Sequence, residues 1–111
     1  MAVLRITIQP GARFPWHTHP GPVLVAVVEG EMTYMYADDC VPRVYLEGGA
    51  FVDPGFDNVH AAFNHANEPM VLVAAFLGVP PDGPLTIGVS AEEGAALDAL
   101  CGVGGAASHA H

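Results

Sequence analysis

Glycine and proline interrupt this chain so often that only short segments of regular structure fit between them. Thirteen glycines and ten prolines are spread over 111 residues, and turn signals recur about every eight to twelve residues, a spacing typical of all-β domains. Most of the segments between them are rich in β-branched and aromatic residues, and several alternate apolar and polar positions, so we expect strands. These segments span residues 3–9, 14–19, 23–29, 31–36, 43–47, 50–53, 59–64, 70–77 and 85–89. Two of them, residues 23–29 and 70–77, are almost continuously apolar; we expect the first to be buried on both or nearly both faces and the second to be a long buried strand.

A single helix is expected, near the C-terminus. Residues 91–99 contain good helix formers, and Ser90 with Glu93 forms a capping box at their start. No helical crossover separates the predicted strands, which disfavours a parallel α/β sheet. Closing the strands into a barrel or jelly roll removes exposed edges. We therefore expect one domain over residues 1–111, with a barrel over about residues 2–89 and a helix and tail over about residues 90–111.

The charge and the apolar segments narrow the classes of partner and the location. The formal net charge is −9, with three arginines, no lysine and twelve acidic residues. This charge argues against binding nucleic acid or an anionic membrane surface. The apolar run at residues 70–79 is too short to span a bilayer, and the N-terminus lacks the pattern of a secretory signal, so we expect a cytoplasmic protein.

Cys40 and Cys101 are the two cysteines, and they lie far apart in the sequence. One disulfide or two free thiols are both compatible with this spacing, and neither cysteine stands in a metal-binding motif.

Three histidines are the candidate metal ligands. His17 and His19 lie two residues apart on a predicted strand, so their side chains point to the same face and form a chelating pair. His60 lies on a second predicted strand and could complete the set. Asp53 and Asp57 flank that segment as weaker candidates for an acidic ligand. The alternative is a group of buried, hydrogen-bonded histidines that binds no metal.

The segments around these histidines resemble the cupin superfamily. Its first motif has a glycine, five residues and His-x-His, with a later glycine, as in Gly11, His17, His19 and Gly30; the glutamate position of the motif falls on Val23. Its second motif is matched by Gly48, Pro54, His60 and Asn64, with one extra residue between Pro54 and His60. The resemblance implies a double-stranded β-helix (a jelly-roll barrel), a homodimer, Asn64 as a structural turn residue and a divalent metal ion held by His17, His19 and His60. Imidazole ligands suit Fe, Mn, Ni, Cu or Zn.

Strand parity and apolar character suggest the lining of a cavity beside the metal. The predicted pocket residues are Arg13, Val23, Val25, Tyr34, Tyr36, Phe51 and Phe76, with Met32 and Phe63 as further candidates. Arg13 has the parity of His17 and could pair with a substrate carboxylate, or it could be an ordinary exposed arginine. Trp16 has the opposite parity and should point away from the cavity.

Two main functional hypotheses follow for a small-molecule site of this kind. The first is a metal-dependent enzyme with dioxygenase-like or isomerase-like chemistry on a small organic molecule. The second is a non-enzymatic barrel that binds a small ligand or binds and senses a metal. A purely structural barrel without metal is the third possibility. No nucleophile–base motif or phosphate-binding glycine loop occurs, and the absence of lysine excludes Schiff-base chemistry.

Overall fold

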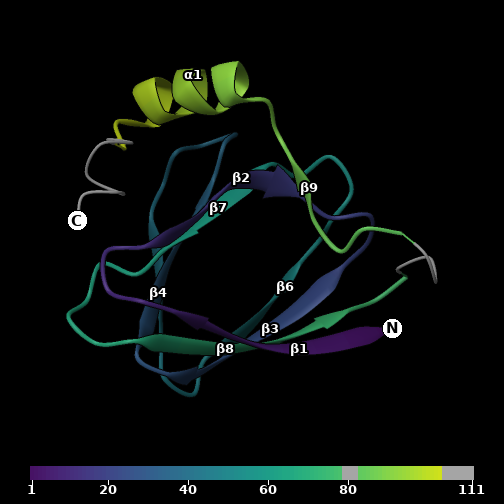
Figure 1. The fold of residues 1–111 in the computed structure, drawn as a ribbon, viewed down its shortest axis with the longest axis vertical. Helices are drawn as coiled ribbons and strands as arrows, with labels where there is room; N and C mark the ends of the chain where they lie inside the picture. Colours follow the sequence, from purple (N-terminus) through teal and green to yellow (C-terminus); the bar gives the residue numbers. More distant parts are fainter. Residues whose placement is uncertain (79–82, 104–111) are drawn as a thin grey trace.

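The computed structural model describes residues 1–78 and 83–103, which form an all-β domain with one C-terminal helix (Figure 1). Its elements are β1 (Ala2–Ile8), β2 (Arg13–Thr18), β3 (Val23–Glu29), β4 (Glu31–Tyr36), β5 (Arg43–Leu46), β6 (Ala50–Asp53), β7 (His60–Phe63), β8 (Met70–Phe76), β9 (Ile87–Gly88) and α1 (Ala91–Cys101). All the predicted strands and the predicted helix are present, with small shifts at their ends. Within the described residues, the helix lacks the length and apolarity needed to cross a membrane. The part of the predicted tail after residue 103 lies outside the described residues.

Two antiparallel sheets face each other across the core. One has the strand order β1-β8-β3-β6 and the other β5-β4-β7-β2-β9. In Figure 1, β1, β8 and β3 of the first sheet lie in the lower part of the view, β2, β7 and β9 of the second lie in the upper part, and α1 lies above β2. Buried side chains of Val27, Met32, Tyr34, Met70 and Leu72 fill part of the space between the sheets. Several neighbouring strands in each sheet are distant in the sequence, so residues from both halves of the chain meet in this space.

Strand β3 differs from the expectation that both its faces are buried. Val23 and Val27 are buried, whereas Leu24 and Val28 are 46% and 38% exposed. The reason is that the β1-β8-β3-β6 sheet is antiparallel and no described helix covers its outer face, so only one face packs on the core.

A β-bulge in β2 determines which of its side chains face the core. Phe14 pairs with Ala62 and His17 pairs with His60, so β2 has one more residue than β7 between these two pairs. The extra residue reverses the parity of the strand at this point. Phe14 therefore lies on the same face as His17.

The same bulge places Arg13 and Trp16 on the outer face, against α1. The Arg13 guanidinium donates two hydrogen bonds to Asp98, each 2.9 Å long, and Trp16 Nε1 donates to the same carboxylate at 2.8 Å. The outward position of Trp16 is as predicted. The expectation that Arg13 points toward the cavity is wrong, because the parity argument assumed an unbroken strand.

Helix α1 packs on the outer face of the β5-β4-β7-β2-β9 sheet. Leu97 and Cys101 contact the cluster formed by Trp16, Met35, Ala61 and Phe63. The hydroxyl of Ser90 accepts a hydrogen bond from the backbone N–H of Glu93, so the predicted N-cap is present. Cys101 forms a disulfide with Cys40. The pairing answers the question that the cysteine spacing left open.

The turn after β7 is organised by Asn64, which is completely buried. Its amide nitrogen donates to the carbonyl oxygens of Ile8 and Glu68, and its side-chain oxygen accepts from the backbone N–H of Ala66. These bonds tie the end of β1 to the turn that leads into β8. The structural role expected for Asn64 agrees with this geometry.

Candidate metal centre

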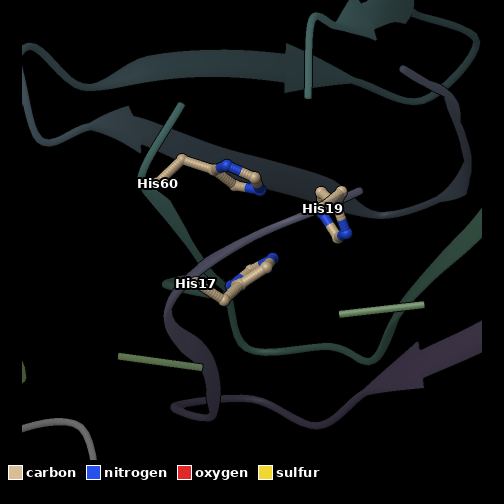
Figure 2. A group of neighbouring side chains, drawn as sticks. All are labelled: His17, His19 and His60. Atoms are coloured by element: carbon tan, nitrogen blue, oxygen red, sulfur yellow. The ribbon is translucent and has the colours of Figure 1, made fainter. Parts of the chain in front are cut away.

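The three predicted histidines come together on the inner side of the β5-β4-β7-β2-β9 sheet (Figure 2). His17 on β2 and His60 on β7 are cross-strand partners, and His19 follows directly after β2. The ring centroids are 4.2 Å apart for His17 and His60, 4.7 Å for His17 and His19, and 5.0 Å for His19 and His60. One ligand nitrogen from each ring lies within 4.8 Å of the others, and all three residues are buried.

Backbone carbonyl groups set the orientation of all three rings. In each ring Nδ1 lies within hydrogen-bonding distance of a carbonyl oxygen, so the neutral imidazole carries its proton there and leaves a lone pair on Nε2. The carbonyl groups belong to Pro15 for His17, Leu85 for His19 and Asn58 for His60. Such a second hydrogen bond is the usual way in which a metal-binding histidine is held in position.

Burial keeps two of these histidines neutral at physiological pH. Burial and the neighbouring His60 lower the pKa of His17 to about 4. Burial also lowers the pKa of His60 below its ordinary value. A histidine must be deprotonated at the coordinating nitrogen to bind a metal, so these pKa shifts favour the binding form.

One carboxylate lies beside the histidines. Asp53, the last residue of β6, is 1% exposed, and its Oδ2 is 3.1 Å from Nε2 of His60 and 3.5 Å from Nε2 of His19. The Tyr34 hydroxyl donates a hydrogen bond to the same oxygen at 2.9 Å. Burial, followed by the nearby Asp53 carboxylate, raises the pKa of Tyr34, so this hydroxyl stays protonated and remains a donor.

A cavity of about 340 Å³ opens beside the three rings. Its wall is mostly apolar, and a site of this size falls at the lower end of the range for small-molecule pockets. The predicted residues that line it are Val23, Val25, Met32, Tyr34, Phe51 and Phe76, together with the three histidines. Phe14, Leu85 and Asp53 also line it. Strand parity did not predict Phe14 as a lining residue, because the β-bulge reverses the parity between Phe14 and His17. Pro15 within the strand is the local signal that could have indicated the bulge.

Three of the predicted pocket residues lie elsewhere. Tyr36 is at the end of β4, where the Arg43 guanidinium lies 4.7 Å from the centre of its ring. Phe63 packs beside Trp16 on the outer face of the sheet, beneath α1, and Arg13 pairs with Asp98 on the same face. None of the three is among the residues lining the cavity. The cavity therefore has no arginine in its described wall.

The donor set fits a divalent metal ion. Three inward-facing nitrogen atoms with lone pairs form a concave group that lacks a hydrogen-bond donor of its own, because the ring N–H groups are used on the carbonyl oxygens. Imidazole nitrogen is a good ligand for Zn, Cu, Fe and Ni, and a carboxylate broadens the range to Mn.

Comparison with known proteins identifies both sequence and structural relatives. The family model described as "Cupin domain" matches residues 4–76. An uncharacterized conserved protein with a double-stranded β-helix domain from Klebsiella pneumoniae subsp. pneumoniae is 22% identical, with a TM-score of 0.62 and coverage of 79% of this chain and 74% of that chain. This likeness establishes the double-stranded β-helix fold that was expected. No curated protein sequence matches significantly.

Two enzymes of known activity share the fold over part of their length. A variant of the salicylate 1,2-dioxygenase of Pseudoaminobacter salicylatoxidans is 25% identical, with a TM-score of 0.57, and the match covers 65% of this chain and 21% of that chain. The oxalate decarboxylase of Bacillus subtilis, which has Mn(II) centres, is 26% identical, with a TM-score of 0.56. The match covers 65% of this chain and 20% of that chain. The present chain thus spans about one fifth of either enzyme.

Proposed function

The chain belongs to the cupin domain family, and on that premise we propose that it is a metal-dependent protein acting on a small, largely apolar organic molecule. His17, His19 and His60 would hold the metal ion, and the substrate would occupy the adjoining cavity. The observation that carries the proposal is the convergence of three oriented Nε2 atoms on the wall of an apolar cavity of about 340 Å³.

A divalent ion of the Fe, Mn, Ni, Cu or Zn group suits this site. The nitrogen donors are compatible with each of these metals, and the oxalate decarboxylase that shares the fold over part of its length has Mn(II) centres, which supports a metal ion in this protein. When bound, the ion would supply Lewis acidity that polarises an oxygen atom of the substrate.

The residues around the site favour a neutral substrate that has a polar group at one end. Apolar side chains line most of the cavity, so they bind the hydrocarbon part of the molecule and exclude water from the reacting end. No arginine is among the described lining residues, and the sequence contains no lysine, so the wall offers no cation for a phosphate or a second carboxylate. A dioxygenase-like or isomerase-like reaction on a compound that carries a carbonyl or hydroxyl group agrees with this lining.

The competing function is a barrel that binds its ligand without converting it. The same cavity and the same histidines would serve a carrier or a sensor. The two functions differ in turnover, which is a property that an assay measures directly.

Removal of one histidine tests the metal site. We expect untagged wild-type protein to contain about one divalent ion per chain, and His60→Ala to contain almost none, because loss of an imidazole ligand should cost more than the roughly 10–100-fold in affinity that loss of a residue orienting a ligand costs. Elemental analysis by mass spectrometry measures the metal content.

Two control variants separate this site from other histidines. His65→Ala removes an exposed histidine near the site in sequence, and a double His109→Ala/His111→Ala variant removes the second His-x-His pair. Both should keep the wild-type metal content. Equal metal content in wild type and His60→Ala would reject the proposed site.

Turnover distinguishes the enzyme from the binding protein. Wild-type protein loaded in turn with Fe(II), Mn(II) and Zn(II) is incubated with a panel of small aromatic and enolisable compounds. Oxygen uptake or isomer formation by the wild-type protein, together with its absence in His60→Ala, supports an enzyme. Ligand binding without conversion across the panel supports the carrier or sensor instead.

A further inference from the structure

We infer that Asp53 is a fourth metal ligand and that the centre consists of three histidines and one aspartate. The inference rests on the proposed metal site and adds to it a residue outside the three-histidine set. The observation behind it is that a buried carboxylate oxygen lies close to the Nε2 atoms of two of the three histidines, His19 and His60.

The spacing of the atoms is that of neighbouring ligands on one ion. Oδ2 of Asp53 is 3.1 Å from Nε2 of His60 and 3.5 Å from Nε2 of His19. Ligand atoms about 2.1 Å from a shared ion are about 3.0 Å apart at right angles and about 3.4 Å apart at the tetrahedral angle. The two measured distances therefore agree with Asp53, His19 and His60 as adjacent members of one coordination sphere.

The chemistry of the facing atoms also calls for a cation. His19 and His60 use their ring N–H groups on carbonyl oxygens, so their Nε2 atoms present lone pairs. A carboxylate oxygen presents lone pairs as well. Acceptor atoms that face one another at these distances repel unless a cation lies between them, and a metal ion bound by all three residues would supply that cation.

The surrounding structure holds the carboxylate of Asp53 in this orientation. Its other oxygen, Oδ1, accepts hydrogen bonds from the backbone N–H of Gly55 at 2.8 Å and from Nδ2 of Asn58 at 3.2 Å. The Tyr34 hydroxyl donates to Oδ2 at 2.9 Å. Hydrogen bonds of this type fix a ligating carboxylate, and they leave a lone pair of Oδ2 directed at the histidines.

The pairing of strands explains how this acid reaches the site. Asp53 on β6 is the direct cross-strand partner of Val23 on β3, and both line the cavity. Side chains of paired residues lie on the same face of a sheet, about 5 Å apart. Val23 occupies the position at which the cupin motif has its glutamate, so the neighbouring strand supplies a carboxylate to the same region. One carboxylate reduces the charge of a divalent centre by one unit, which strengthens retention of the ion.

Replacement of Asp53 by asparagine tests the inference by metal affinity. We expect Asp53→Asn to weaken binding of Mn(II) and Zn(II) to the metal-free protein by at least about 100-fold, the upper end of the loss seen when a residue that only orients a ligand is removed. Isothermal titration calorimetry with each metal alone measures the Kd. Asp57→Asn is the matched control, because it removes the same charge from an exposed position four residues away and should leave the Kd unchanged.

The results separate this inference from the proposed function. If the wild-type protein binds no metal and so behaves as His60→Ala is expected to, the proposed metal site itself is overturned. A wild-type protein that binds metal, with Asp53→Asn binding as tightly, overturns only the role of Asp53. A structural role alone would lower the melting temperature of metal-free Asp53→Asn without changing the Kd of the folded protein.

A second measurement applies if Asp53→Asn does not fold. In a crystal structure of the wild-type protein loaded with Mn(II) or Zn(II), a coordinating Oδ2 would lie about 2.0–2.2 Å from the ion. An Oδ2 separated from the ion by a water molecule would contradict the inference.

Discussion

At the scale of single residues, the carboxylate of Asp98 joins the helix to the barrel. It accepts hydrogen bonds from Arg13 and Trp16 on β2, and the side chains of Arg13 and Asp98 are each only 14% exposed. The bonds to Arg13 and, after them, the bond from Trp16 hold the pKa of Asp98 below its ordinary value of 3.8. A partly buried, bidentate pair of this kind contributes more to stability than an exposed ion pair does.

We expect Asp98→Asn to lower the free energy of unfolding by about 2 kcal/mol at pH 7, because hydrogen bonds to a charged group are lost. The folded-state pKa of Asp98 is depressed, so its contribution is complete above about pH 4 and is lost as the pH falls through the folded-state pKa. The difference between wild type and variant should therefore shrink below pH 4. Urea unfolding at pH 7, 5 and 3 measures it, with the exposed Asp38→Asn as the control. A difference of the same size at pH 7 and pH 3 would show that the charge of Asp98 is unimportant.

At the scale of the elements, α1 depends on a covalent link as well as on packing. No residue of the helix is fully buried, and only Leu97 and Cys101 of its apolar side chains pack on the cluster around Trp16. The disulfide ties the end of α1 to Cys40, the two cysteines being 61 residues apart in sequence. Disulfides persist mainly in oxidising compartments and are rare in the cytosol. The disulfide therefore does not support the cytoplasmic location expected from the sequence, which stays a prediction.

A Cys40→Ser/Cys101→Ser variant should be less stable by up to about 4 kcal/mol, because the link closes a long loop in the unfolded chain. Its metal content should equal that of the wild type, since the disulfide lies on the outer side of the sheet that carries the histidines. Urea unfolding and elemental analysis measure the two properties. Thiol titration of the unreduced, denatured wild type provides the check, and two free thiols per chain would contradict the pairing.

At the scale of the whole molecule, the outer face of the β1-β8-β3-β6 sheet presents a continuous apolar row. Val3, Ala75, Leu24 and Val52 lie side by side across the four strands in register. Val3, Leu24 and Val52 are 57%, 46% and 55% exposed. Contiguous exposed apolar side chains are one of the marks of a surface that contacts another protein chain.

We propose that two chains form a homodimer through this face, which is the oligomeric state that the resemblance to the cupin superfamily implies. Leu24→Glu should convert the dimer into a monomer, because it places a charge in the middle of the apolar row. Val44→Glu, at a position on the other sheet that is at least as exposed as Leu24, should leave the dimer intact. Light scattering coupled to size-exclusion chromatography measures the mass, and a wild-type protein that remains a monomer at high concentration would refute the proposal.

The number and order of the elements, and the three histidines as a group, could be predicted from the sequence. Turn residues and strand alternation are local signals, so the bounds of β3, β4 and β6 agree with those expected. The His-x-His spacing places two imidazoles on one side of the chain, and the two cupin motifs connect them to His60.

Contacts between distant strands could only be decided by the tertiary structure. The bulge in β2 turned Arg13 away from the cavity and brought Phe14 into it. Pro15 is a local sign of an irregular strand, but the extra residue is defined only by the pairing of β2 with β7. The position of Asp53 beside the histidines depends on the pairing of β6 with β3 across from Val23, and the disulfide depends on where α1 docks. Periodicity along one strand determines which face a side chain takes, whereas the neighbours that it meets on that face are determined by the register between strands.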